Sequence, residues 1–190
     1  EHAFEGVSDP SGIFMEDDGG ALPGTGVSFM AAGMRMIPIE VQALINGSKQ
    51  QRPVRQFSGV PFDRGQIVCA VLDKFCKAGL SDREVFLSTV SGVRVPQTET
   101  LCDLGVAAAV LSSLRGKTDG KRRAYIGELA LTGRIQGIHM VDRRVREALR
   151  LGFDEVVVPA VAARSLPDSL RDDRRVRAIG SVDELAALFR

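Results

Sequence analysis

Residues 98–115 constrain the fold more than any other part of this sequence. Apolar side chains lie at nearly every position around the helix that this segment predicts, among them Leu101, Leu104, Val110 and Leu114. A helix that is apolar nearly all round must be covered by other parts of the protein. The sequence therefore predicts a central, buried helix at the heart of the domain.

The residues before this helix predict strands and one further helix. Apolar, β-prone runs at residues 27–31 and 36–44 predict a hairpin, and residues 53–57 predict a third strand. Pro38 favours an edge position for its strand, because proline cannot donate a hydrogen bond to a neighbour. An amphipathic pattern over residues 64–77 then predicts a helix, with Asp63 as its N-cap and Gly79 at its end.

Strands and helices alternate in the second half of the chain. Strands are predicted at residues 85–90, 125–131, 134–138, 156–159 and 176–179, of which the second and third form a pair. A charged amphipathic helix is predicted at residues 139–151 and a final helix at residues 182–189. This order indicates an α/β fold (mixed α+β), in which helices pack on sheets.

Several classes of protein are excluded by the composition. The three cysteines are few and odd in number, and Cys69 and Cys76 lie inside an apolar helical pattern, so neither a disulfide framework nor a metal site is expected. No apolar run is long enough to span a membrane, and no signal peptide opens the chain. We therefore expect a soluble protein of a reducing, intracellular compartment.

The net charge of +1 conceals an uneven distribution. The first 20 residues carry six acids and no Lys or Arg, which leaves 25 bases against 18 acids in the rest. Turn-forming residues and charge predict an acidic linker over residues 1–21, followed by one folded domain over residues 22–190. Because the chain begins with Glu1 rather than Met, we expect it to be a piece of a longer protein.

Four blocks of sequence carry a resemblance to a known family. They begin at Phe86, Thr98, Gly127 and Glu147 and read FLSTVSGVRV, TETLCDLGVAAAVLSSLR, GELALTGRI and EALRLGFDEVVVP. In order and spacing they resemble the C-terminal Lon-protease-like domain of the RadA (Sms) DNA-repair proteins of bacteria and plastids. The VSDPS segment at Val7 also resembles the linker that joins this domain to an upstream ATPase core.

The resemblance implies a Lon proteolytic-domain-like fold that assembles with itself into a homohexameric ring. It also implies a RecA-like ATPase core and a zinc finger upstream, so ATP, magnesium and zinc are expected there and no cofactor is expected in this chain. The glycine-rich residues 19–26 agree with this, because they lack the Lys-Ser/Thr pair of a phosphate-binding loop and no helix follows. The compartment implied is a bacterial cytoplasm or the interior of a plastid or mitochondrion.

Lon peptidases use a serine nucleophile and a lysine of lowered pKa that takes the serine proton. The resemblance places Leu101 at the serine position and Asp142 at the lysine position, so we expect a domain that keeps the fold without peptidase activity and has no catalytic residue. An alternative remains open, in which Thr100 or Cys102 is a substitute nucleophile and His139 its base. Cysteine in such an apolar helix is, however, usually a small buried hydrophobe.

Basic clusters are the other functional candidates, because Lys and Arg at loops contact phosphates readily. Residues 115–123 contain five bases and one acid, whereas the bases of residues 164–177 are offset by three aspartates. In the charged helix, Asp142 and Arg146, like Arg143 and Glu147, have the i,i+4 spacing of surface ion pairs. The residues predicted to contact DNA are Arg55, Arg64, Arg115, Lys117, Lys121, Arg122, Arg123, Arg134, Arg143 and Arg144.

With one Tyr and no Trp, the chain offers little on which bases could stack. We therefore expect single-stranded or branched DNA to be held through its phosphates. The prediction is a non-catalytic Lon-like domain of a DNA-repair or recombination ATPase, which builds a hexamer and contacts DNA. Two alternatives stay open: a scaffold for assembly that binds no DNA, and a residual peptidase.

Overall fold

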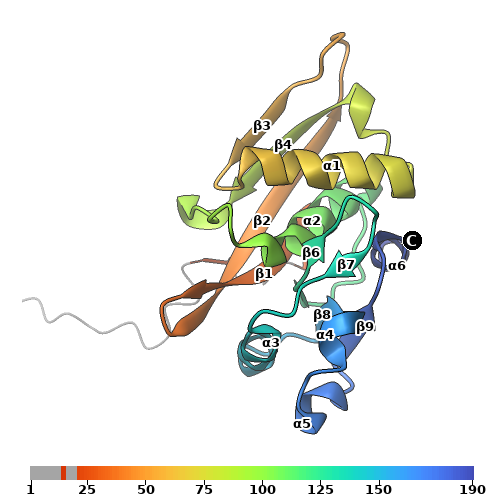
Figure 1. Ribbon diagram of the computed structural model, residues 1–190. Coiled ribbons are helices and arrows are strands. Elements are labelled where there is room, and N and C mark those ends of the chain that lie inside the picture. The colour runs from red at the N-terminus through yellow and green to blue at the C-terminus, as the bar shows by residue number, and fades with distance from the viewer. Residues whose placement is uncertain (1–13, 16–20) are drawn as a thin grey trace, which may run out of the picture.

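The computed structural model describes residues 14–15 and 21–190 (Figure 1). The acidic linker predicted over residues 1–21, with the VSDPS segment, lies almost entirely outside the described residues. The architecture therefore concerns the predicted domain at residues 22–190.

A seven-stranded mixed sheet forms the frame of the domain, in the order β3-β4-β2-β1-β5-β8-β9. Its strands are β1 (Thr25–Ala32), β2 (Arg35–Gly47), β3 (Arg55–Ser58), β4 (Arg83–Thr89), β5 (Arg123–Tyr125), β8 (Glu155–Pro159) and β9 (Val176–Ile179). β2 pairs antiparallel with both β1 and β4, and the other neighbours are parallel. This confirms the predicted α/β class with helices packed on a sheet.

β1 and β2 form the predicted hairpin, but β2 is an inner strand and the prediction that Pro38 marks an edge strand is wrong. β4 pairs only with Val41–Gly47, so Pro38 lies in the half of β2 that has β1 as its sole sheet neighbour. Glu40, two residues on, donates its N–H to Phe14 and thus away from β1. The proline nitrogen faces the same side, where it interrupts no ladder bond.

The predicted central helix is α2 (Asp103–Arg115), which is buried from its first residue to Ser112. It begins later than predicted because Thr100–Cys102 forms a tighter 3₁₀ turn that leads into it. The helix approaches β1 closely where two glycines meet, since a Cβ on Gly26 would lie 2.2 Å from the Gly105 carbonyl oxygen. A larger residue at Gly26 would therefore push α2 away from the sheet.

Helix α1 (Phe62–Cys76) covers the same face of the sheet as α2 (Figure 1). Pro61 is its N-cap, so the prediction that Asp63 caps it is wrong, and Asp63 lies in the first turn instead. At the other end the left-handed C-cap is Lys77, with φ 53°, rather than a glycine. Gly79 is also left-handed, with φ 66°, and turns the chain toward β4.

The second half confirms the alternation of strands and helices and shifts some boundaries. The predicted strand at 125–131 is split: β5 joins the main sheet, whereas β6 (Glu128–Leu129) pairs with β7 (Ile135–Gln136) in a small separate sheet. The helices are α3 (Val141–Arg150), α4 (Ala160–Ala163), α5 (Asp168–Arg171) and α6 (Val182–Ala187). Neither α4 nor α5 was predicted, because one helical turn is too short to show a hydrophobic period.

Two apolar clusters occupy the two faces of the sheet. Ile39 and Val41 of β2 belong to the cluster of α1, α2 and α6. Val27 and Phe29 of β1 belong to the cluster on the other side, with Val145 of α3. Alternate residues of a strand point to opposite faces, so one hairpin feeds both clusters. Leu101, in the turn before α2, and Val141, at the start of α3, belong to this second cluster as well.

Candidate functional site

Leu101 and Asp142, the residues that the resemblance aligns with the Lon dyad, lie in the 3₁₀ turn ahead of α2 and in α3. Leu101 belongs to the 3₁₀ turn ahead of α2, is 4% exposed, and lies in one apolar cluster with Met140 and Val141. Asp142 is half-buried in the first turn of α3. The leucine side chain fills the space beside Gly137, where a Cβ would lie 2.3 Å from Leu101 Cδ2. A buried apolar side chain thus occupies the position that the resemblance aligns with the Lon serine.

The contacts of Cys102 and His139 do not favour the substitute site. Cys102 is 2% exposed and its Sγ lies 3.8 Å from the carbonyl oxygen of Phe29. Burial, reinforced by the nearby Glu99 carboxylate, raises the pKa of this thiol to about 12. The thiol is therefore protonated at neutral pH, whereas the thiolate is the nucleophile. His139 is exposed and precedes α3, which begins two residues later than predicted.

Thr100, the other substitute nucleophile considered, has a different partner. Its hydroxyl donates to a carboxylate oxygen of Glu128 at 2.9 Å. That acceptor is a weak base and lies in β6, so the contact joins the 3₁₀ turn to the small sheet. The contact with Glu128 gives Thr100 a structural role in the turn before α2.

Arg64, a predicted DNA contact, binds the carboxylate of Asp103. Its Nε lies 3.1 Å from Oδ1, and its Nη2 donates to Oδ2. The same carboxylate accepts the N–H of Leu129 at 3.1 Å, and Glu128 lies 4.0 Å from Arg64. Asp103 is 3% exposed, and burial raises its pKa to about 6 although Arg64 favours the charged form. Arg64 is therefore best explained as the partner that makes this buried acid tolerable.

Arg144, another predicted DNA contact, is 1% exposed and lies inside the protein. Its guanidinium donates to the Phe29 carbonyl and forms an ion pair with Glu99 at 2.9 Å. Glu99 also accepts the N–H of Ala31 at 3.2 Å. Arg144 thus fastens α3 to the β1–β2 hairpin and to the turn before α2, and its charge does not reach the surface.

Two more candidates are engaged within the protein. Arg123 is buried and pairs with both Asp119 and Glu155, which raises its pKa against the cost of desolvation. Arg55 donates to the carbonyls of Leu80 and Arg83 and so ties β3 to the start of β4. Both guanidinium groups therefore hold the fold at places where the sequence suggests contact with phosphate.

The remaining candidates keep their charge at the surface. Arg115, Lys117, Lys121 and Arg134 are exposed, and Arg122 and Arg143 are half-buried. Across the residues that the structure describes, none of these six forms an ion pair. In α3 an ion pair joins Glu147 to Arg150, three residues apart, at 2.6 Å. Arg134 lies beside β7, whereas Arg115, Lys117, Lys121 and Arg122 lie at the end of α2 or in the loop between α2 and β5.

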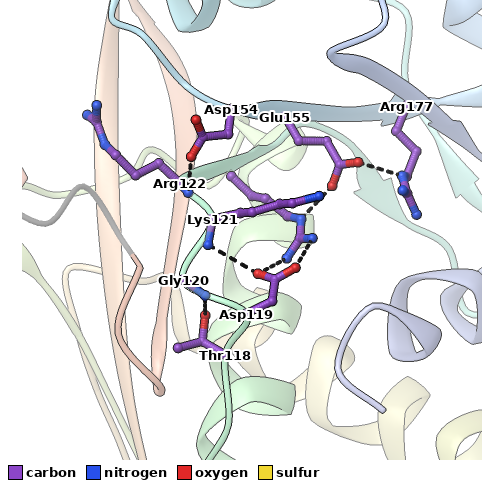
Figure 2. Close-up of polar contacts among 9 residues, drawn as sticks. Thr118, Asp119, Gly120, Lys121, Arg122, Asp154, Glu155 and Arg177 are labelled. Atoms are coloured by element: carbon purple, nitrogen blue, oxygen red, sulfur yellow. Dashed lines mark hydrogen bonds and ion pairs between the residues drawn. The ribbon is translucent and has the colours of Figure 1, made fainter.

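Figure 2 shows how this loop, residues 116–122, is fixed to the body of the domain. The Asp119 carboxylate accepts the N–H of Lys121 at 3.2 Å and binds the guanidinium of Arg123. The Asp154 carboxylate accepts the N–H of Arg122 at 2.9 Å. These acids hold the backbone while the side chains of Lys117 and Lys121 remain exposed. The loop is therefore a basic surface on an ordered backbone.

Most of the chain matches a known protein family. Residues 12–189 match the Lon protease (S16) C-terminal proteolytic domain family. The chain belongs to this family. The match confirms the Lon-like fold expected from the sequence blocks, and it covers the described domain together with part of the preceding segment.

The relatives of this Lon-like domain include several DNA repair proteins RadA. That of Mycolicibacterium smegmatis is 37% identical over 159 residues, 84% of this chain and 34% of its own length. That of Halalkalibacterium halodurans is 35% identical over 159 residues, again 84% of this chain and 34% of its own. That of Chlamydia pneumoniae is 31% identical over 183 residues, 96% and 40%. The resemblance to the C-terminal Lon-like domain of RadA is thus confirmed, and the chain spans about two fifths or less of these relatives.

The described part of the Lon-like domain has neither a membrane-spanning helix nor a metal-binding cluster. Within residues 14–15 and 21–190, no helix is both long and apolar enough to cross a membrane. Among the same residues, no group of three or more His, Cys, Asp or Glu is placed to hold a metal ion.

The acids that hold the arginines of this Lon-like domain were missed by the sequence analysis. Glu99 and Asp103 are 45 and 39 residues from the arginines that they bind, so no local pattern could reveal them. Asp119 is four residues before Arg123, but the segment between them is a loop, where the i,i+4 rule of helices does not apply. No local pattern therefore separates Arg123 from the exposed bases beside it.

Proposed function

We propose that this chain is the non-catalytic Lon-like domain of a RadA-like DNA-repair protein. In this proposal the domain assembles into a homohexameric ring and offers a DNA-contacting surface to a RecA-type ATPase in the upstream part of the protein. The names of the RadA relatives support DNA repair as the process. ATP, magnesium and zinc would belong to the upstream parts, and the DNA would be single-stranded or branched.

The contacts at the dyad positions support the absence of peptidase chemistry. Leu101 carries no nucleophile and Asp142 cannot serve as the base that a lysine provides in Lon. Cys102, the nearest thiol, has a pKa raised to about 12 by burial and would have to ionise inside an apolar cluster. Without an activated nucleophile, acyl transfer loses most of its acceleration.

The observation that carries the DNA proposal is the group of exposed bases on the ordered loop between α2 and β5. Arg55, Arg64, Arg123 and Arg144 are held by carbonyls or carboxylates. This leaves the exposed Arg115, Lys117 and Lys121 and the half-buried Arg122, which lie within eight residues of one another in the chain. Lysine and arginine at such a surface bind phosphates and release counterions. A ring would repeat the set around one axis and so strengthen the local field.

The test measures the affinity of the chain for single-stranded and branched DNA at several salt concentrations. The variant combines Lys117→Ala, Lys121→Ala and Arg122→Ala. The matched control combines Lys49→Ala, Lys74→Ala and Arg164→Ala, three exposed bases that lie elsewhere. The loop variant should lose at least about tenfold in affinity at low salt and should lower the salt slope by about 2 to 3.

Other outcomes favour the alternatives. If the unmodified chain sediments as a hexamer and binds no DNA even at low salt, the domain is a scaffold for assembly. If loop variant and control lose the same affinity, the proposed surface is wrong. Turnover of casein that is abolished by Cys102→Ala would instead revive the residual peptidase.

A further inference from the structure

A shallow depression of about 410 Å³ lies beside the basic loop and is lined by two segments far apart in the sequence. Lys121 comes from the loop before β5, whereas Arg174 comes from the segment between α5 and β9. Gly152 and Phe153, in the turn after α3, also line it. The fold thus brings Arg174 to the same depression as Lys121 of the basic loop.

The three aspartates that offset the bases of residues 164–177 in the sequence are occupied by other arginines. Asp168 and Asp172 pair with Arg171, at 2.7 and 3.3 Å. Asp173 pairs with Arg175 at 2.7 Å, and this holds the pKa of Asp173 down at about 2. Arg174 is exposed and forms no ion pair with any residue that the structure describes. The charge of Arg174 therefore remains available to a ligand in the depression.

The acids that line the depression are likewise engaged. The Glu155 carboxylate pairs with Arg123 and, as Figure 2 shows, with Arg177 at 2.8 Å. Because Arg123 also binds Asp119, these two arginines and two acids carry no net charge. The Asp154 carboxylate accepts the backbone N–H of Arg122 and keeps its own charge, so it offsets one of the surrounding bases.

Arg122 does not line the depression, but it is a third cation next to Gly152 and Phe153, which do. Its guanidinium lies over the Phe153 ring, 5.1 Å from the ring centre, and a Cβ on Gly152 would lie 3.8 Å from its Nη1. Its Nε is buried without a hydrogen-bond partner among the described residues. In Figure 2 its side chain extends away from Asp119. Stacking on an aromatic ring fixes the orientation of the group and leaves its charge intact.

We propose that Lys121, Arg122 and Arg174 form one binding site for the phosphodiester backbone of a nucleic acid. The inference rests on the proposed DNA contact and names the residues that make it, including one that the sequence analysis set aside. Phe153 is buried beneath Arg122, so it offers no exposed aromatic face on which a base could stack. The three cations therefore bind phosphate groups and not bases. Fixed backbone at Lys121 and Arg122 lowers the entropy lost on binding.

The experiment compares Arg174→Ala with Arg171→Ala in the full chain. Both remove one positive charge from neighbouring exposed positions, but Arg171 is held by two aspartates. Arg174→Ala should weaken the binding of a single-stranded oligonucleotide about tenfold at ~50 mM salt and lower the salt slope by about one. Arg171→Ala should change the affinity by less than about twofold, because its charge is already neutralised.

The outcomes separate this inference from the proposed function. If the unmodified chain binds no DNA, the proposed function fails. If it binds, and Lys121→Ala weakens binding while Arg174→Ala matches Arg171→Ala, the shared site is wrong and the DNA contact stands. Competition by inorganic phosphate at constant ionic strength forms a second arm. Competition at millimolar concentration would point to a site for a single phosphate and against one that requires the polymer.

Discussion

Arg64 of α1 donates hydrogen bonds from two guanidinium nitrogens to the buried carboxylate of Asp103, in the first turn of α2. The two residues are 39 apart in the chain. Because the same carboxylate accepts the N–H of Leu129, one side chain joins α1, α2 and β6. Asp103 directly follows the 3₁₀ turn that holds Leu101, so the pair also fixes the end of that turn against α1.

Replacement of Arg64 by methionine should be costly for stability and neutral for DNA binding. It leaves a buried carboxylate without its cation, and such a loss costs about 3 kcal/mol in the free energy of unfolding. Urea denaturation measures this free energy. The control, Lys74→Met on the exposed side of the same helix, should cost less than about 0.5 kcal/mol. Equal effects of the two changes would contradict a structural role for Arg64.

Asp103 should make stability depend on pH in a defined window. Its pKa is raised to about 6 in the folded chain and is about 4 in the unfolded chain. Between these values the folded chain binds more protons at this group, so the free energy of unfolding falls as pH rises from about 4 to 6. This effect is isolated by subtracting the free energy of unfolding of Asp103→Asn from that of the unmodified chain at each pH. If that difference rises with pH instead of falling, the pKa of Asp103 is lowered in the folded chain.

Arg144 should act as an internal brace between α3 and the hairpin. Arg144→Met leaves Glu99 without its partner and should lower the free energy of unfolding by about 3 kcal/mol. Arg146→Met, on the exposed side of α3, is the control and should cost less than about 0.5 kcal/mol. Adding Glu99→Gln to Arg144→Met should restore part of the loss, since no unpaired charge then remains. The salt slope of DNA binding should stay unchanged throughout.

The cysteines should differ in their reaction with iodoacetamide at pH 8. Burial raises the pKa of Cys69 to about 11 and that of Cys102 to about 12. Cys76 is half-buried, and burial raises the pKa of its thiol as well. We expect Cys76 to be modified first and the other two only on unfolding, as read by mass spectrometry. Modification of native Cys102 as fast as Cys76 would support the Cys–His alternative.

Hydrophobic pattern was enough to predict most elements of the fold. The strand at 176–179 agrees with β9 at both ends, and the apolar segment at 98–115 is the buried helix α2 after a short 3₁₀ turn. The pattern was least informative at the ends of elements. A tertiary contact or a left-handed residue such as Lys77 decides where a helix stops, and neither leaves a periodic signal.

The candidate site was predicted less well than the fold. The basic loop was identified from local charge density, and its exposed lysines agree with that prediction of a charged surface. Arg64 and Arg144 were grouped with them because a sequence counts charges without showing their partners. Arg174 was set aside for the opposite reason, since the aspartates beside it bind Arg171 and Arg175 instead.

The sequence by itself determined that a helix apolar on nearly every side must be central and that the fold is α/β. These conclusions depend on side-chain chemistry and on local period, which the order of residues contains. Only the tertiary structure decided which bases are exposed. An arginine 39 or 45 residues from its carboxylate is neutralised through space, because the Coulomb energy depends on the distance between charges and on burial.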